Sequence, residues 1–118
     1  MRHVFALSVL DWVPQLPGVY CIETRSSRDR YVGSTGNLRK RYLSHLRELI
    51  YGIHTNRDLQ KVFDMQRTVM FFRILKLCKR EECLRLEQKY LDRMGVYTSV
   101  HFVNKHNKAG SGHYGNTR

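Results

Sequence analysis

Apolar and aromatic residues fall into short runs that predict three β-strands. The run Gly18–Thr24 is rich in β-branched and aromatic residues, and a second run, Arg30–Ser34, follows the polar, turn-like stretch 26–29. These two runs predict a hairpin. A third strand is expected over Val69–Leu77, which is mostly apolar.

Apolar residues at helical spacing predict three helices. Asn37 is a candidate N-cap for a long helix that Gly52 ends, with an apolar stripe of Leu38, Tyr42, Leu46, Leu49 and Ile50. Thr55 or Asn56 could cap a second, shorter helix. The last helix is expected over about Arg80–Met94, with an inward stripe of Leu84, Tyr90, Leu91 and Met94.

The order of these elements predicts an α+β fold, in which helices flank a small three-stranded antiparallel sheet. The length of 118 residues is that of a single domain. We divide the chain into an N-terminal arm or short helix (1–16), the main domain (17–104) and a basic, glycine-containing C-terminal tail (105–118).

The charge balance points to a polyanionic partner. The chain has 21 Lys and Arg against 10 Asp and Glu, a formal net charge of +11. Such an excess opposes folding by self-repulsion, and nucleic acid is the commonest partner that relieves it. A protein that is merely basic is the alternative. No apolar run approaches the ~20 residues that cross a bilayer, so we expect no membrane partner.

Cysteine usage indicates a reducing compartment. Cys21, Cys78 and Cys83 are odd in number, and no second Cys or His pair follows at structural-zinc spacing. We therefore interpret them as buried or free thiols. With no signal-peptide cleavage site after the short apolar start, a cytoplasmic location is expected.

Several polar residues are candidates for chemistry. Tyr20 and Tyr31 lie on the two hairpin strands; if the neighbouring valines face the core, both phenols face the other way, toward solvent or a substrate. Ordinary cross-strand aromatic packing is the alternative. Arg41 and His45 are four residues apart and share one face of a densely basic helix, where a solvated charged face is the simpler interpretation.

Two further candidates lie later in the chain. His54 and Thr55 stand at the start of the second helix, and a helix N-terminus favours phosphate. Glu87 falls on the expected core face of the last helix, where a carboxylate needs a partner. A salt bridge to arginine would satisfy it, and so would Mg²⁺, which accepts one carboxylate with waters and phosphates.

Taken in order, these residues resemble the GIY-YIG endonuclease family. Its two name-giving tripeptides appear as Gly18-Val19-Tyr20 and Tyr31-Val32-Gly33, with valine in place of isoleucine. The similarity continues through the set Ser34, Asn37, Arg41, His45, His54, Thr55, Asn56, Glu87, Tyr90 and Leu91. It closes on Asn104 (or Asn107) and Ala109-Gly110-Ser111, as in phage homing-type members, and covers about residues 17–112.

The resemblance implies a divalent-metal-dependent DNA endonuclease that leaves a 5′-phosphate and a 3′-hydroxyl. On that basis Glu87 binds Mg²⁺ or Mn²⁺, and Tyr20 is the general base or base relay, with Tyr31 and His45 in its hydrogen-bond network. Arg41 neutralises charge on the phosphate. The residues expected to position the phosphate or support the site are His54, Thr55, Asn104, Arg39 and Lys40.

A catalytically silent nucleic-acid-binding module of the same fold is the alternative. A degenerate copy is expected to lose Glu87, Arg41 or one tyrosine, and all are present. RNA as substrate stays open, as do cleavage specificity, nick or double-strand break, a separate DNA-recognition domain and the biological role. We expect a monomer or a weak dimer.

Overall fold

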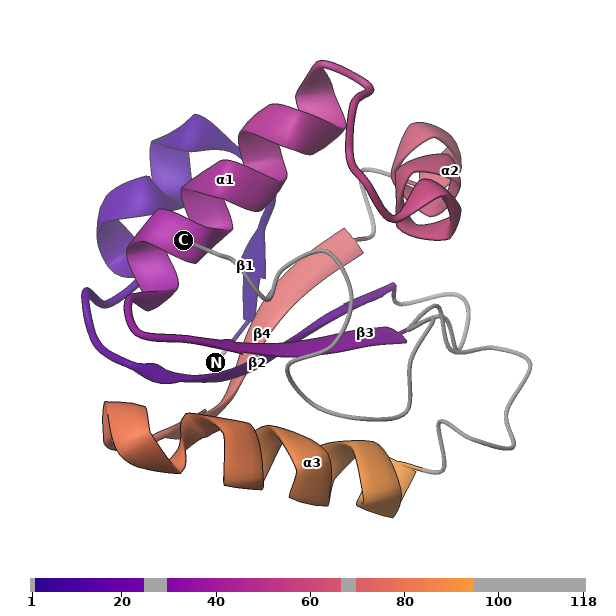
Figure 1. The fold of residues 1–118 in the computed structure, drawn as a ribbon. Helices are drawn as coiled ribbons and strands as arrows, with labels where there is room; N and C mark the ends of the chain where they lie inside the picture. The colour runs from indigo at the N-terminus through magenta and orange to yellow at the C-terminus, as the bar shows by residue number, and fades with distance from the viewer. Residues whose placement is uncertain (1, 25–29, 67–69, 95–118) are drawn as a thin grey trace.

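The computed structural model describes residues 2–24, 30–66 and 70–94, which form one sheet with helices on both faces (Figure 1). The strands are β1 (Arg2–Val4), β2 (Gly18–Thr24), β3 (Arg30–Thr35) and β4 (Met70–Leu77). They pair in the order β1-β4-β2-β3, and every pairing is antiparallel. The α+β prediction is confirmed, but the sheet has four strands rather than three, because β1 adds to the edge of β4.

Local signals explain the predicted helices. In α1 (Leu38–Ile50), the Asn37 side chain caps the helix by accepting a hydrogen bond from the Lys40 amide at 3.1 Å. After α1, Gly52 takes a φ of 73°, a left-handed conformation that glycine adopts without strain. Asn56 begins α2 (Arg57–Gln66) with its side chain on the Leu59 amide, at 3.1 Å.

The third helix begins later than expected, and its buried face differs in part from the expected one. Residues Arg80–Glu82 form a 3₁₀ turn (η3), and α3 is Cys83–Met94. The residues facing the sheet are then Cys83, Leu86, Glu87, Tyr90 and Leu91. Leu84 is 57% exposed, so its placement on the inward stripe was wrong. Among the described residues, no helix is long and apolar enough to cross a membrane.

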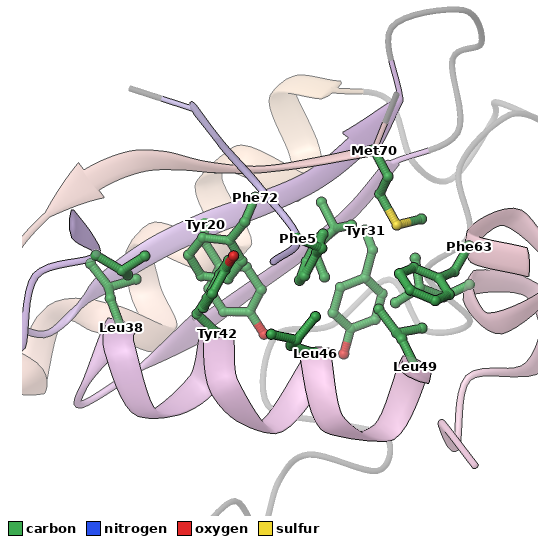
Figure 2. Close-up of a cluster of buried hydrophobic side chains, with 13 residues drawn as sticks. Phe5, Tyr20, Tyr31, Leu38, Tyr42, Leu46, Leu49, Phe63, Met70 and Phe72 are labelled. Atoms are coloured by element: carbon green, nitrogen blue, oxygen red, sulfur yellow. The ribbon is translucent and has the colours of Figure 1, made fainter. Parts of the chain in front are cut away.

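Two hydrophobic layers cover the two faces of the sheet. The larger one packs α1 and α2 against the sheet, and Figure 2 shows Leu38, Tyr42, Leu46 and Leu49 of α1 turned toward aromatic side chains from the strands. The smaller one packs Val19, Cys21 and Val32 against α3. Ile50, expected on the inward stripe of α1, is 46% exposed.

The N-terminal segment is built into the larger layer. It forms β1 and the 3₁₀ helix η1 (Leu7–Trp12), so the expected arm is a strand followed by a short helix. The Phe5 ring stacks on Tyr42 with centroids 5.2 Å apart. The Tyr42 hydroxyl accepts from the Ala6 amide at 3.0 Å and donates to main-chain carbonyls of Val4 and Ala6.

Candidate active site

The two motif tyrosines point into the larger core. Tyr20 on β2 and Tyr31 on β3 share the face covered by α1, and their side chains are 0% and 3% exposed. Val19 and Val32 point to the opposite face, as alternation requires, but α3 covers that face. The expectation that the phenols turn away from the core was therefore wrong, because both faces of the sheet are buried. Figure 2 shows both phenols directed from the sheet toward α1.

Gly33 makes room for the Tyr20 phenol. The two residues are directly paired across β2 and β3. A Cβ at Gly33 would lie 2.6 Å from the Tyr20 hydroxyl oxygen and 2.7 Å from the ring carbon that bears it. Both distances are far below van der Waals contact, so the second tripeptide needs glycine to accommodate the tyrosine of the first.

Helix α1 brings Arg41 and His45 to this phenol. The two residues lie one turn apart on the inner face of α1 and are 9% and 2% exposed, so they do not belong to a solvated face. His45 Nε2 lies 2.7 Å from the Tyr20 hydroxyl oxygen. The Arg41 guanidinium also hydrogen-bonds to Tyr20. An imidazole and a cation therefore meet at one phenol oxygen.

His54 extends this arrangement by a second imidazole. Its Nε2 lies 2.8 Å from His45 Nδ1, and the two rings stack with centroids 5.0 Å apart. His54 is fully buried, its main-chain amide donates to Gln60 Oε1 at 3.1 Å, and its Nδ1 accepts from the Asn56 amide at 3.0 Å. The Tyr31 ring packs edge-on against His45 at 5.7 Å.

Burial dominates the acidity of Tyr20. It raises the pKa of the phenol from 10.0 to about 12, because the phenolate form loses its hydration. The positive charge and hydrogen bond of Arg41 oppose this increase, whereas the negative charges of Glu87 and Glu48 add to it. Glu87 of α3 thus acts electrostatically on the same phenol that Arg41 contacts.

Glu87 approaches from the other face of the sheet. Its carboxylate is 1% exposed and accepts a hydrogen bond from the Ser34 hydroxyl at 2.6 Å. This length is typical of a hydroxyl donating to a charged oxygen. Ser34 belongs to the motif similarity, yet sequence reasoning assigned it no role. Strand alternation, which puts Ser34 on the face opposite Tyr31, was the available signal.

Arg39, Lys40 and Thr55, which were also predicted as site residues, lie outside this cluster. Arg39 donates to the Val13 carbonyl at 2.8 Å and the Asp11 carbonyl at 3.0 Å, so it ties η1 to α1. Lys40 and Thr55 are exposed. Asn104 and the alternative Asn107 lie outside the described residues. Sequence reasoning missed Gln60, which is buried and also donates to the Leu49 carbonyl at 2.9 Å.

The described residues hold no group of three or more His, Cys, Asp or Glu arranged for a metal ion. The cysteines are free thiols: Cys21 and Cys83 are buried, and Cys78 is half-buried. The Cys78 and Cys83 sulfurs are 3.4 Å apart. Any metal ion held by the described part of the chain would therefore have fewer than three His, Cys, Asp or Glu ligands, together with water and substrate.

A phenol, two imidazoles and a guanidinium therefore lie together on one face of the sheet, and a carboxylate lies on the other face. Residues 16–97, more than half of the chain, match the family model described as the GIY-YIG catalytic domain. The chain therefore belongs to the GIY-YIG family, and it is a nuclease domain, as the sequence resemblance indicated. No curated protein sequence matches the chain significantly.

Solved structures support the fold. The catalytic domain of the intron endonuclease I-TevI, in a mutant form, superposes with a TM-score of 0.66 at 22% identity, covering 77% of this chain and 94% of that one. A structure described as the catalytic domain of the homing endonuclease I-TevI gives 0.65 at 21% identity, covering 75% and 99%. At this identity the similarity establishes the architecture.

Proposed function

We propose that this protein is a divalent-metal-dependent DNA endonuclease that hydrolyses a phosphodiester bond, leaving a 5′-phosphate and a 3′-hydroxyl. The observation that carries the proposal is that His45, Arg41 and Glu87 all act on the Tyr20 hydroxyl oxygen. Its oxygen is hydrogen-bonded to His45 at 2.7 Å and to Arg41. The negative charge of Glu87 also acts on it and raises the pKa of the phenol. Phosphodiester hydrolysis needs a proton acceptor for water, a cation for the phosphate and an anion for the metal, and these are the groups present.

DNA is the proposed substrate for two reasons. The net charge of +11 favours a polyanion. In addition, the structural relatives are described as intron and homing endonucleases. We expect the protein to act as a monomer or weak dimer, so a double-strand break requires two active sites or two successive nicks. Size-exclusion chromatography with light scattering tests the oligomeric state.

The carboxylate of Glu87 fits the metal that the family implies. A single buried carboxylate suits Mg²⁺ or Mn²⁺, since Mg²⁺ commonly binds one or two carboxylates and keeps waters and phosphate oxygens as its other ligands. Ser34 orients this carboxylate through its 2.6 Å hydrogen bond. When bound, the ion supplies charge stabilisation to the phosphate and the leaving group.

The other steps of the reaction are assigned to individual side chains. Tyr20 accepts a proton from the attacking water either as its phenolate, after its own hydroxyl proton has left, or as a relay that passes on its own proton while it takes the one from water. Arg41 neutralises charge at the phosphate, for which a guanidinium can offer two parallel donors. His45 holds the phenol in place through its hydrogen bond, and Tyr31 packs against the His45 ring. Lys40 is exposed on α1 and is available to contact the DNA backbone.

Nicking of supercoiled plasmid by the full chain tests the proposal. We expect nicks with Mg²⁺ or Mn²⁺, none in EDTA, and loss of at least about 100-fold in rate in Glu87→Gln. Glu81→Gln is the matched control, because it makes the same charge change at an exposed position of η3. Salt-sensitive DNA binding without cleavage of plasmid, single-stranded or branched DNA would instead identify a silent binding module.

A further inference from the structure

A continuous line of hydrogen bonds leads from the main chain of Asn56 to the phenol of Tyr20. The Asn56 amide donates to His54 Nδ1 at 3.0 Å, His54 Nε2 meets His45 Nδ1 at 2.8 Å, and His45 Nε2 meets the phenol oxygen at 2.7 Å. The first donor is a main-chain N–H, which cannot reverse its direction. The direction of every later bond follows from it.

The first step concerns His54. Its Nδ1 accepts the Asn56 N–H, so that nitrogen carries no proton. The neutral ring must then carry its proton on Nε2, and a doubly protonated ring would lose the bond from Asn56. Glu48 Oε1 lies 3.7 Å from the same Nε2, which is consistent with a proton there. Gln60 fixes this segment through the 3.1 Å bond from the His54 amide.

The second step concerns His45. Since His54 Nε2 donates, His45 Nδ1 accepts and is unprotonated. A neutral His45 then carries its proton on Nε2, which faces Tyr20. If Tyr20 donated to that nitrogen instead, neither ring nitrogen of His45 would carry a proton. An imidazolate at this position is not a reasonable state.

We propose that the Asn56 amide, acting through His54, fixes His45 as a hydrogen-bond donor to the Tyr20 oxygen. Asn56, His54 and Gln60 are therefore positioning residues for the proposed nuclease reaction, and this role rests on that proposed function. The Tyr20 oxygen accepts two bonds, one from His45 and one from Arg41. Its own hydrogen is directed away from His45.

This direction assigns His45 a specific role. His45 is not the acceptor of the Tyr20 proton; it stabilises negative charge on the phenol oxygen and keeps its own proton. To act as the base, Tyr20 first releases its own hydroxyl proton to solvent. The phenolate oxygen then takes a proton from the attacking water, so that a water O–H bond breaks and the Tyr20 O–H bond forms again, while the water oxygen bonds to phosphorus and the bond from phosphorus to the 3′ oxygen breaks. The charged groups that act on this oxygen are Arg41 of α1, Glu87 of α3 and Glu48 of α1.

NMR of the full chain tests the assignment without any nuclease assay. Long-range ¹H–¹⁵N correlation spectra distinguish the two neutral tautomers of a histidine ring from each other and from imidazolium. We expect His45 and His54 both to carry their proton on Nε2 near neutral pH, with resonances assigned from single variants. Either ring found with its proton on Nδ1, or doubly protonated, would overturn the proposal.

Two variants of His54 test the coupling. In His54→Leu, His45 Nδ1 loses its donor, so we expect a new population with the proton on Nδ1. We also expect a fall in kcat of about tenfold, the equivalent of one hydrogen bond, with little change in KM. His54→Gln keeps an N–H donor and should recover part of the rate. His3→Gln, on β1, is the control for loss of a histidine.

The outcomes separate this inference from the proposed function. Unchanged His45 tautomers in a folded His54→Leu variant would refute the coupling. If wild-type His45 and His54 both carry Nε2 protons but the protein cuts no DNA, the hydrogen-bond direction stands and the proposed nuclease function fails. A melting curve for each variant establishes that it is folded.

Discussion

One added carbon at Gly33 should damage catalysis more than folding. A Cβ there would lie 2.6 Å from the Tyr20 hydroxyl oxygen, whereas favourable contacts begin near ~3.5 Å. The phenol must therefore move by about 1 Å in Gly33→Ala. That movement breaks the 2.7 Å hydrogen bond to His45, so the phenol loses its alignment.

The expected magnitudes follow from this displacement. We expect the plasmid-nicking rate of Gly33→Ala to fall about 100-fold, because a misplacement of about 1 Å can cost that much. The clash should also lower the free energy of unfolding by about 1–3 kcal/mol. For 118 residues, each kcal/mol corresponds to a Tm decrease of about 4 °C.

Gly52→Ala is the matched control. In the described part of the chain, no atom beyond the neighbouring residues lies within 4 Å of a Cβ at Gly52, but its φ of 73° strains an alanine. We expect a loss of about 1–2 kcal/mol and a smaller fall in the nicking rate than in Gly33→Ala, because Gly52 does not contact Tyr20. Single-turnover nicking and circular-dichroism melts, measured where both variants are folded, compare the two. Wild-type nicking by Gly33→Ala, or equal loss of activity in both variants, would refute the reasoning.

Three further predictions concern single side chains. Ser34→Ala removes the 2.6 Å donor from buried Glu87 and should cost about 1–3 kcal/mol in urea unfolding. Asn37→Ala should cost about 1 kcal/mol, because it deletes the cap of α1. Burial raises the pKa of Tyr20 from 10.0 to about 12, so the unfolded chain loses this proton first. The contribution of Tyr20 to the free energy of unfolding is therefore fully present below pH 10 and is lost as the pH rises from 10 toward 12. Tyr20→Phe should remove this part of the pH dependence of stability.

Each of these has its own contradicting result. Exposed Ser44 on α1 is the control for Ser34, and equal effects of the two alanine variants would contradict the Glu87 argument. A stability of Asn37→Ala within about 0.3 kcal/mol of wild type would mean that the cap contributes nothing. Parallel stability curves of wild type and Tyr20→Phe between pH 9 and 12 would contradict the raised pKa.

The strands and helices with strong local signals could be predicted from the sequence. β2, β3, β4, α1 and α2 have an alternating or helical apolar pattern, and Asn37 and Gly52 mark the limits of α1. β1 could not be predicted, because three residues with two charged or polar side chains have no strand pattern. β1 forms because it pairs with β4, which lies far away in the sequence.

The members of the site could be predicted, but their arrangement could not. Tyr20, Arg41 and His45 were selected by motif and spacing. The stacking of His54 on His45 depends on the tight turn at Gly52, which folds the chain back onto α1. The Ser34–Glu87 bond joins residues 53 positions apart on two different elements, so no local pattern indicates it.

Strand β1 has a consequence for how much of this chain behaves as a folding unit. The family match begins at residue 16, after β1 and Phe5. A protein trimmed to that boundary would leave the outer row of amide and carbonyl groups on β4 open to another molecule, and unpaired strand edges promote aggregation. Tyr42 would keep its ring in the core but lose its hydroxyl partners at Val4 and Ala6. Expression of the shortened domain should therefore yield insoluble material, because β1 no longer covers the edge of β4.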